Sequence, residues 1–201
     1  MRNPTGSASD CSRDMDTRQA ELFFSILTVV VIVGTFLLAL AALLAPVNHT
    51  LARLVDAIRP FGLRLAAAVA ATCMAGSLYF SEVAGFLPCT LCWYQRIAMY
   101  SLAVVLMVAA VRHDVAIRWY ALPLAGIGGA IATYHWLLER FPSIDAGACS
   151  ASVPCEFVWF ERFGFVTLPF MAMSGFAAVI ALLVVATAPA TSPTATPGDL
   201  S

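Results

Sequence analysis

The chain has 201 residues, of which 61% are hydrophobic and only 11% are charged, and its mean hydropathy is +0.86. A soluble domain of this length could not bury so much apolar surface, so the composition indicates an integral membrane protein. The formal net charge of -1 leaves no basic field and argues against a nucleic-acid-binding protein. The absence of lysine excludes lysine-based catalysis.

The composition changes along the chain divide it into five segments. Residues 1–20 are polar, lack apolar periodicity and are predicted to form a disordered tail. Residues 21–46 exceed the apolar core of a signal peptide, so we expect a retained extra N-terminal transmembrane helix. Residues 47–62 carry arginines on an amphipathic pattern and are predicted to form a linker at the membrane surface. Residues 63–187 are the predicted four-helix core, and 188–201 are a predicted disordered tail.

Five apolar runs are each near or above the roughly 20 residues that a helix needs to cross a bilayer. They cover approximately residues 21–46, 63–86, 94–111, 117–138 and 165–187. The predicted fold class is therefore an all-α integral membrane protein, with a four-transmembrane-helix bundle preceded by an extra N-terminal transmembrane helix. A four-span core with a first segment that does not cross the membrane is the alternative.

The distribution of arginine suggests an orientation. With five crossings, the 47–64 and 112–118 loops share one side and hold five arginines, whereas the opposite side holds two cysteine-containing loops and fewer arginines. The positive-inside rule therefore predicts that the cysteine loops are extracytoplasmic. Arg2, Arg13 and Arg18 disagree with this rule, because an odd number of spans places the N-terminus beside the cysteines. The side of the N-terminus is left open.

A C-x-x-C motif, Cys89-Thr90-Leu91-Cys92, lies where one apolar run ends and the next begins. Two thiols at this spacing can form a disulfide, and a thiolate near a helix start is stabilised by unpaired backbone N–H groups. Arg96 falls on the same face if a helix begins near Cys92. An arginine just inside the membrane is expensive unless it is paired, so we predict a thiolate or a polar cofactor head group as its partner. An interfacial arginine on lipid phosphate is the alternative.

A second cysteine pair, Cys149 and Cys155, lies in the polar 139–164 loop. Small residues around it suit a flexible hairpin closed by a disulfide, with a purely structural staple as the alternative. Four cysteines could also build a zinc site, but the first pair's position at a helix start argues against it, and we expect no metal. Cys73 is predicted to be an inert residue within a span, and Cys11 has no evident partner.

His135 lies near the end of the fourth apolar run, on the side of both cysteine pairs. It is predicted to donate a hydrogen bond to a cofactor carbonyl or to carry a proton, with Glu139 at i+4 orienting it. The alternative is a polar group anchored at the interface. An aromatic cluster before the last span is interpreted as an interfacial belt in preference to a partner-binding surface; it consists of Trp159, Phe160, Phe163 and Phe165.

These motifs together resemble one known family. The segment Pro88-Cys-Thr-Leu-Cys-Trp-Tyr-Gln-Arg96 resembles the first cysteine loop of the DsbB family of disulfide-bond formation proteins, especially its BdbC branch. Tyr134-His135-Trp-Leu-Leu-Glu139 resembles the family's histidine segment. The second cysteine pair followed by Phe163-Gly-Phe-Val-Thr-Leu-Pro-Phe170 resembles its second loop and last helix. The resemblance covers roughly residues 63–187 and leaves 1–60 outside the family's four-helix core.

The resemblance implies a membrane quinone reductase that re-oxidises a DsbA-like, thioredoxin-fold thiol oxidase. It implies ubiquinone or menaquinone as cofactor and the bacterial inner (plasma) membrane as location. Carried over by position, Cys149 would be attacked by the partner's thiolate, and Cys155 would be its disulfide partner. Cys89 would exchange with the second pair, and Cys92 would be the thiolate that touches the quinone.

Three further residues carry expectations from the same resemblance. Arg96 would stabilise the Cys92 thiolate, and His135 would lie near a quinone oxygen. Family members have Glu at the position of Gln95, so we expect Arg96 to be less neutralised here.

Two other functional classes are weighed against this hypothesis. One is a vitamin K epoxide reductase-like enzyme or a transmembrane reductant carrier, but the former has its C-x-x-C late in the core and the latter would place cysteines within spans. The other is a non-enzymatic membrane scaffold with structural disulfides, whose thiols would resist exchange with a partner.

Overall fold

The computed structural model describes residues 8–145, 147, 149 and 153–188, with side chains from residue 16 onward. The regular elements of this part are helices, and an isolated β bridge joins Arg162 and Val166. The predicted all-α fold class is confirmed.

Six α-helices make up most of the described chain. They are α1 (Ala8–Leu44), α2 (His49–Ile58), α3 (Gly62–Leu78), α4 (Thr90–Arg112), α5 (Arg118–Arg140) and α6 (Leu168–Thr187). Five segments are long and apolar enough to cross a membrane, as predicted: Asp16–Leu44, His49–Val83, Thr90–Arg112, Val115–Arg140 and Leu168–Thr187.

The N-terminal third differs from prediction in its boundaries. Helix α1 begins at Ala8, so the predicted disordered tail is wrong for residues 8–20, while residues 1–7 and the C-terminal residues 189–201 lie outside the described part. The predicted 47–62 linker contains α2, whose first turn is capped by Asn48 through hydrogen bonds from two backbone N–H groups. Val55 of α2 is buried against α1 and α6, so this helix packs under the bundle.

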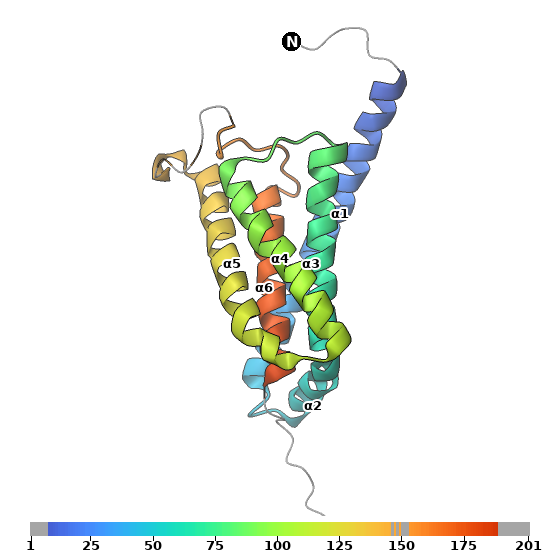
Figure 1. Cartoon of the computed structure of the whole chain (residues 1–201), viewed down its shortest axis with the longest axis vertical. Coiled ribbons are helices and arrows are strands. Elements are labelled where there is room, and N and C mark those ends of the chain that lie inside the picture. Colours follow the sequence, from blue (N-terminus) through green and yellow to red (C-terminus); the bar gives the residue numbers. More distant parts are fainter. Residues whose placement is uncertain (1–7, 146, 148, 150–152, 189–201) are drawn as a thin grey trace, which may run out of the picture.

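Helices α3, α4, α5 and α6 form a four-helix bundle in which each helix packs against two neighbours (Figure 1). Leu102 and Leu106 of α4 and Phe176 of α6 are fully buried at its centre. Gly128 of α5 faces the Phe176 ring, and a Cβ at this position would collide with that ring. Small residues therefore permit the close approach of α5 and α6, as is usual between transmembrane helices.

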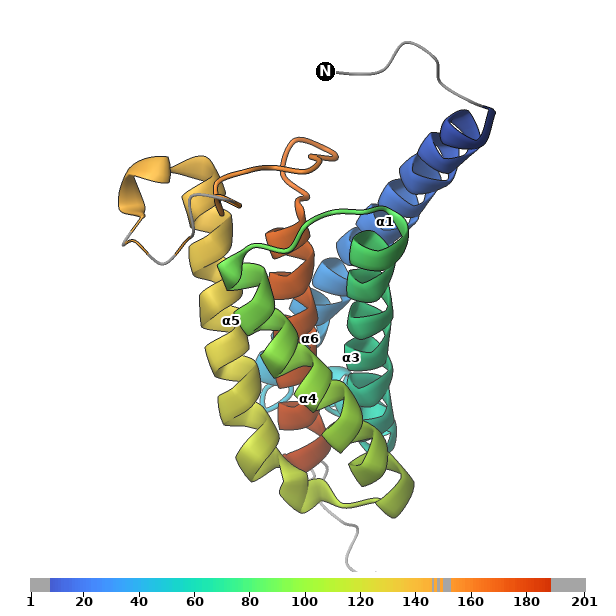
Figure 2. The same ribbon diagram turned by 45° about the horizontal axis from the view of Figure 1, so that its top comes forward.

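Helix α1 lies outside this bundle and runs obliquely beside it (Figure 2), packed mainly on α6. The buried residues in its first half are polar: Glu21, Ser25 and Thr28 are at most 9% exposed, and Ala41 is buried nearer its end. Its outer face is apolar, with Phe23 62% and Val30 61% exposed. This polarity is inverted relative to a surface helix of a soluble protein and suits a helix between protein and lipid.

The connections at one end of the bundle carry the cysteine motifs. The start of α1, the α3–α4 connection and the described parts of the 141–167 loop lie together at the top of Figure 1, opposite α2 and the α4–α5 turn. A π-helical turn, Tyr79–Val83, ends α3, and Gly85 then adopts a positive φ of 74°, which is inexpensive only for glycine. This turn directs the chain back so that α4 begins directly after Cys89.

Candidate redox site

The C-x-x-C motif occupies the N-terminus of α4. Cys89 is the N-cap residue in an extended conformation, and its sulfur accepts a hydrogen bond of 3.3 Å from the Cys92 backbone N–H. The two sulfur atoms are 2.9 Å apart, and both cysteines are free thiols. Cys89 is 5% exposed, whereas Cys92 is half-buried. The local sequence therefore sets two thiols side by side at a helix start, as predicted.

The environment of Cys89 favours its thiolate. The pKa of the Cys89 thiol is lowered from its ordinary value, chiefly by the hydrogen bond with the Cys92 side chain. Burial opposes this shift, and the hydrogen bond from His135 adds to it. A thiolate is the nucleophile in disulfide exchange, so Cys89 is electronically prepared for that chemistry.

The second pair is closed and lies against the first. Cys149 and Cys155 form a disulfide, in which Cys155 is 2% exposed and Cys149 is half-buried. The Cys89 and Cys155 sulfur atoms and a ring nitrogen of His135 all lie within 4.8 Å of one another. Tertiary structure thus brings two cysteine pairs that are more than 50 residues apart in the sequence to within reach of sulfur exchange.

The group of Cys89, His135 and Cys155 has the spacing of metal ligands, but its chemistry does not suit a metal ion. Metal sites use cysteine as a thiolate. The Cys155 sulfur is already bonded to Cys149, so it is not available as a thiolate in this oxidation state. The same bond disagrees with the zinc alternative, which needs all four cysteines reduced.

His135 is buried between the two pairs and is held by Gln95. The Gln95 amide Nε2 lies 2.9 Å from His135 Nδ1, and His135 Nε2 lies 3.0 Å from the Cys155 carbonyl oxygen and 3.7 Å from the Cys89 sulfur. With the amide donating to Nδ1, Nε2 carries the proton and faces the sulfur atoms. The partner that orients His135 is therefore Gln95, and the expectation that Glu139 does so is wrong.

Arg96 lies one turn beyond Cys92, and its hydrogen bonds go to α3. Its Nε donates to the Ser77 hydroxyl at 3.0 Å and one terminal nitrogen donates to the Ser77 carbonyl at 3.1 Å. Tyr100 donates to the same hydroxyl at 3.2 Å, and the guanidinium lies 5.3 Å from the Trp93 ring centroid. Ser77 is a positioning residue that the sequence alone did not single out, since a lone serine within an apolar run carries no motif.

A cavity of about 300 Å³ lies beside this site. Its lining is mostly apolar, with Cys92, Gln95, Arg96 and His135 gathered where α4 begins. The predicted cofactor-binding residues Cys92, Arg96 and His135 therefore share one cavity, and Gln95 joins them. A concave apolar space with a few convergent polar groups is the usual form of a small-molecule site.

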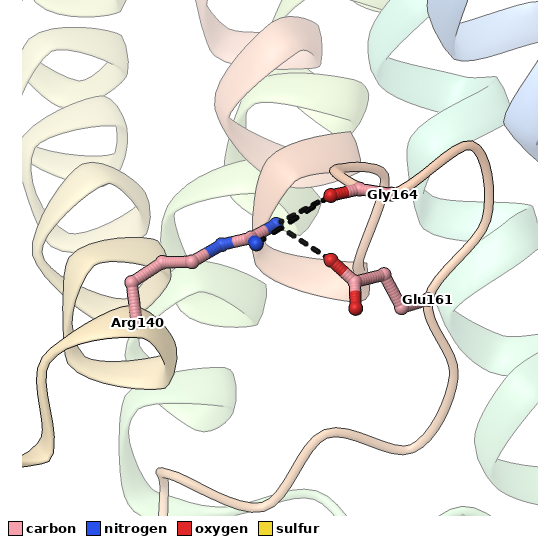
Figure 3. Close-up of polar contacts among 3 residues, drawn as sticks. All are labelled: Arg140, Glu161 and Gly164. Carbon is pink, nitrogen blue, oxygen red and sulfur yellow. Dashed lines mark hydrogen bonds and ion pairs between the residues drawn. The ribbon is translucent and has the colours of Figure 1, made fainter.

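The second loop is anchored after Cys155 by ion pairs. Arg140, at the end of α5, reaches across to the loop, where it pairs with Glu161 at 2.9 Å and donates to the Gly164 carbonyl (Figure 3). Arg162 pairs with Glu21 of α1 at 2.7 Å. These contacts join the loop to two separate helices.

The aromatic cluster of this loop is divided between the interior and the surface. Trp159 stacks on Phe86 with ring centroids 4.8 Å apart and lines the cavity. Phe160 packs on Phe80, with ring centroids 5.6 Å apart. Phe163 is 56% exposed, as suits an interfacial residue.

Comparison with known proteins yields a consistent set of relatives. The family described as "Disulfide bond formation protein DsbB" matches residues 59–186. The chain is 43% identical over 111 residues to a probable disulfide formation protein of Oceanobacillus iheyensis, covering 54% of this chain and 77% of the relative. It is 43% identical over 113 residues to disulfide bond formation protein C of Bacillus subtilis, covering 56% of this chain and 82% of the relative. No solved structure matches this chain.

The matched region begins just before α3 and ends within α6, so it contains nearly all of the four-helix bundle and both cysteine pairs and leaves α1 and α2 outside. Because the match covers more than half of the chain, this multi-pass membrane protein belongs to the DsbB family of disulfide bond formation proteins.

Proposed function

We propose that this protein is a thiol:quinone oxidoreductase that re-oxidises an extracytoplasmic thioredoxin-fold thiol oxidase and delivers the electrons to a membrane quinone. The observation that carries the proposal is the position of the first cysteine pair between the second cysteine pair and the apolar cavity. The Cys89 sulfur lies within 4.8 Å of the Cys155 sulfur, while Cys92 lines the apolar cavity. One thiol thus faces the second pair, and the other faces a space suited to a cofactor.

The first step takes place at the second pair. Cys149 is more accessible than Cys155, which supports Cys149 as the sulfur attacked by the partner's thiolate. That attack forms a mixed disulfide and releases Cys155 as a thiolate. The partner's second thiolate then displaces Cys149, so the partner leaves as a disulfide and its two electrons stay on Cys149 and Cys155.

The second step joins the two pairs. With Cys89 and Cys92 as a disulfide, the Cys155 thiolate attacks the Cys89 sulfur and Cys92 leaves as a thiolate. Cys149 then attacks Cys155, which restores the Cys149–Cys155 disulfide and releases Cys89. The resulting oxidation state, a first pair of thiols beside a disulfide in the second pair, is the one found in the structure. The lowered pKa of Cys89 supports its role as the leaving thiolate of this step.

The cavity residues fit a quinone. A bound quinone would supply the oxidising power by accepting two electrons and two protons from the first pair. Cys92 would face it, Arg96 would hold positive charge beside the Cys92 sulfur, and His135 would hold a proton at Nε2. The fit rests on an apolar lining with these polar groups at one end, and it suits ubiquinone and menaquinone alike.

The proposed location is the bacterial plasma membrane, with both cysteine loops outside the cytoplasm. The opposite end of the bundle contains Arg53 and Arg59 near α2 and Arg112 and Arg118 near the α4–α5 turn, which supports a cytoplasmic position for that end.

The test uses purified full-length protein, a reduced thioredoxin-fold oxidase and a soluble quinone. Wild type is expected to consume one quinone for each partner dithiol, that is, for every two partner thiols. Cys92→Ser should abolish quinone reduction, whereas Cys149→Ser should block acceptance of electrons from the partner. Retention of full activity by both variants would contradict the proposal. A scaffold with structural disulfides would instead yield no trapped mixed disulfide through Cys149.

A further inference from the structure

The cavity beside Cys92 has a wall that comes from outside the family-matched region. Helix α1 contributes Phe24, Leu27, Thr28 and Val31 to the lining. The family match begins at residue 59, so these side chains belong to the added helix and not to the shared four-helix bundle.

Helix α1 is seated against the bundle at the level of this cavity. The Phe24 ring fills the notch at Gly76 of α3, where a Cβ would lie 2.8 Å from Phe24 Cε1. The same ring lies 5.5 Å, centroid to centroid, from Phe80. One turn earlier, Glu21 forms an ion pair with Arg162 of the second loop. Packing and an ion pair together fix α1 in a defined register on the cavity.

The wall contributed by α1 is apolar in character. Phe24, Leu27 and Val31 are hydrocarbon side chains, and the Thr28 hydroxyl donates to the Phe24 carbonyl of its own helix at 2.7 Å. Gln95, Arg96 and His135 come instead from the start of α4 and from α5, and further hydroxyl groups come from α3, its π-helical turn and α6. Such a lining, polar at one part and apolar at another, suits a ligand with a polar ring and a hydrocarbon chain.

The opposite face of α1 points away from the bundle. Phe23 and Ile26, which neighbour the wall residues in sequence, are 62% and 50% exposed. In a membrane this face would meet lipid, so α1 stands between the cavity and the surrounding hydrocarbon.

We propose that α1 is a specificity-determining wall of the quinone site: its Phe24-to-Val31 face contacts the isoprenoid chain of the bound quinone and limits which chains the cavity accepts. This inference rests on the proposed function, and it adds a role for a helix that the family match does not include.

The first test is direct and does not depend on turnover. Full-length protein in lipid nanodiscs is incubated with a quinone that carries a photoreactive group on its isoprenoid chain, illuminated, and cleaved after arginine. The sequence separates α1 in the fragment 19–53 from most of α3 in the fragment 65–96. Label in the 19–53 fragment, competed by unlabelled quinone, is expected. Competable label confined to other fragments would overturn the inference.

The second test compares a cavity-facing with a lipid-facing tryptophan on the same helix. Leu27→Trp places bulk in the cavity wall, and Ile26→Trp places it on the exposed face. Leu27→Trp should raise the KM for a long-chain quinone about tenfold or more, the scale of a few methylene contacts in an apolar pocket. Its KM for a quinone without a chain should rise less than its KM for the long-chain quinone, which separates an effect on the chain from a general loss of the fold. Ile26→Trp should change neither value.

The outcomes separate the inference from the function on which it depends. If wild type reduces quinone but Leu27→Trp and Ile26→Trp respond alike to chain length, the role of α1 is wrong and the proposed function stands. If wild type neither reduces nor binds any quinone, the proposed function is wrong and the inference falls with it.

Discussion

Gln95 and His135 are joined through Nε2 and Nδ1 at 2.9 Å, and both side chains are buried, at 7% and 3% exposure. Gln95 lies one turn beyond Cys92 on α4, whereas His135 comes from α5. This bond turns the other ring nitrogen of His135 toward Cys155 and Cys89. Gln95 was expected from the family resemblance to affect Arg96, but in this structure it orients His135.

Replacing Gln95 with leucine should destabilise the site. The change leaves a buried histidine nitrogen unpaired, at a cost of about 1–3 kcal/mol. We expect a lower midpoint of thermal unfolding and slower exchange between the two cysteine pairs, measured by quenched-flow alkylation. Gln95→Glu, which keeps a hydrogen-bonding group, is the matched control and should retain more activity. Equal unfolding midpoints and equal exchange rates for Gln95→Leu and wild type would contradict the orienting role of Gln95.

The reactivity of Cys89 should depend on pH in a way that its neighbours control. Because hydrogen bonding to Cys92 and then His135 lowers the Cys89 pKa, removing either donor should favour the thiol and move the pKa upward. The midpoint of Cys89 alkylation, followed by mass spectrometry over roughly pH 3–9, should therefore shift to higher pH. Cys92→Ala should shift it further than His135→Leu. A shift toward lower pH in either variant would refute this assignment.

Gly128→Ala should destabilise the bundle, whereas Gly126→Ala should not. A Cβ at Gly128 meets the Phe176 ring and the Ala98 side chain, while a Cβ at Gly126 has no neighbour within 4 Å. Overpacking of this kind costs about 1–3 kcal/mol. Both changes lie on α5, so a thermal unfolding series in one detergent compares them directly. Similar midpoints for the two variants would show that α5 and α6 move apart at little cost.

Arg140→Gln should affect the partner step more than stability. The side chains of Arg140 and its partner Glu161 are 32% and 40% exposed, and such pairs contribute less than about 1 kcal/mol. Loss of the Glu161 and Gly164 contacts (Figure 3) should nevertheless release the loop from α5. We expect a raised KM for the reduced partner with an unchanged KM for quinone. Arg112→Gln, at the far end of the bundle, is the control, and an equal effect there would contradict this prediction.

Much of the architecture was predictable because membrane burial imposes simple rules on sequence. Five apolar runs long enough to span a bilayer identified five spans, and Pro88 to Cys92 identified a helix start carrying two thiols. The start of α1 was predicted too late, since its polar first turns continue the helix as far back as Ala8 without any apolar signal.

The partners of the site residues were not predictable, because they come from other helices. Sequence spacing suggested Glu139 for His135 and a thiolate for Arg96, both neighbours on the same helix. For His135 the structure supplies Gln95 of the neighbouring helix instead, and for Arg96 it adds Ser77 of α3 to the nearby Cys92. A helix-face argument finds neighbours three or four residues away and has no access to contacts between helices.

The sequence by itself determined a membrane protein with a helix-capping thiol pair, a second cysteine pair and the order of its spans, because these depend on hydropathy and local spacing. Only the tertiary structure decided that Cys89 meets Cys155, that Cys92 faces a cavity, and that α1 closes one side of it. Those relationships depend on how the helices and the second loop pack, and packing joins residues whose distance along the chain carries no information about their distance in space.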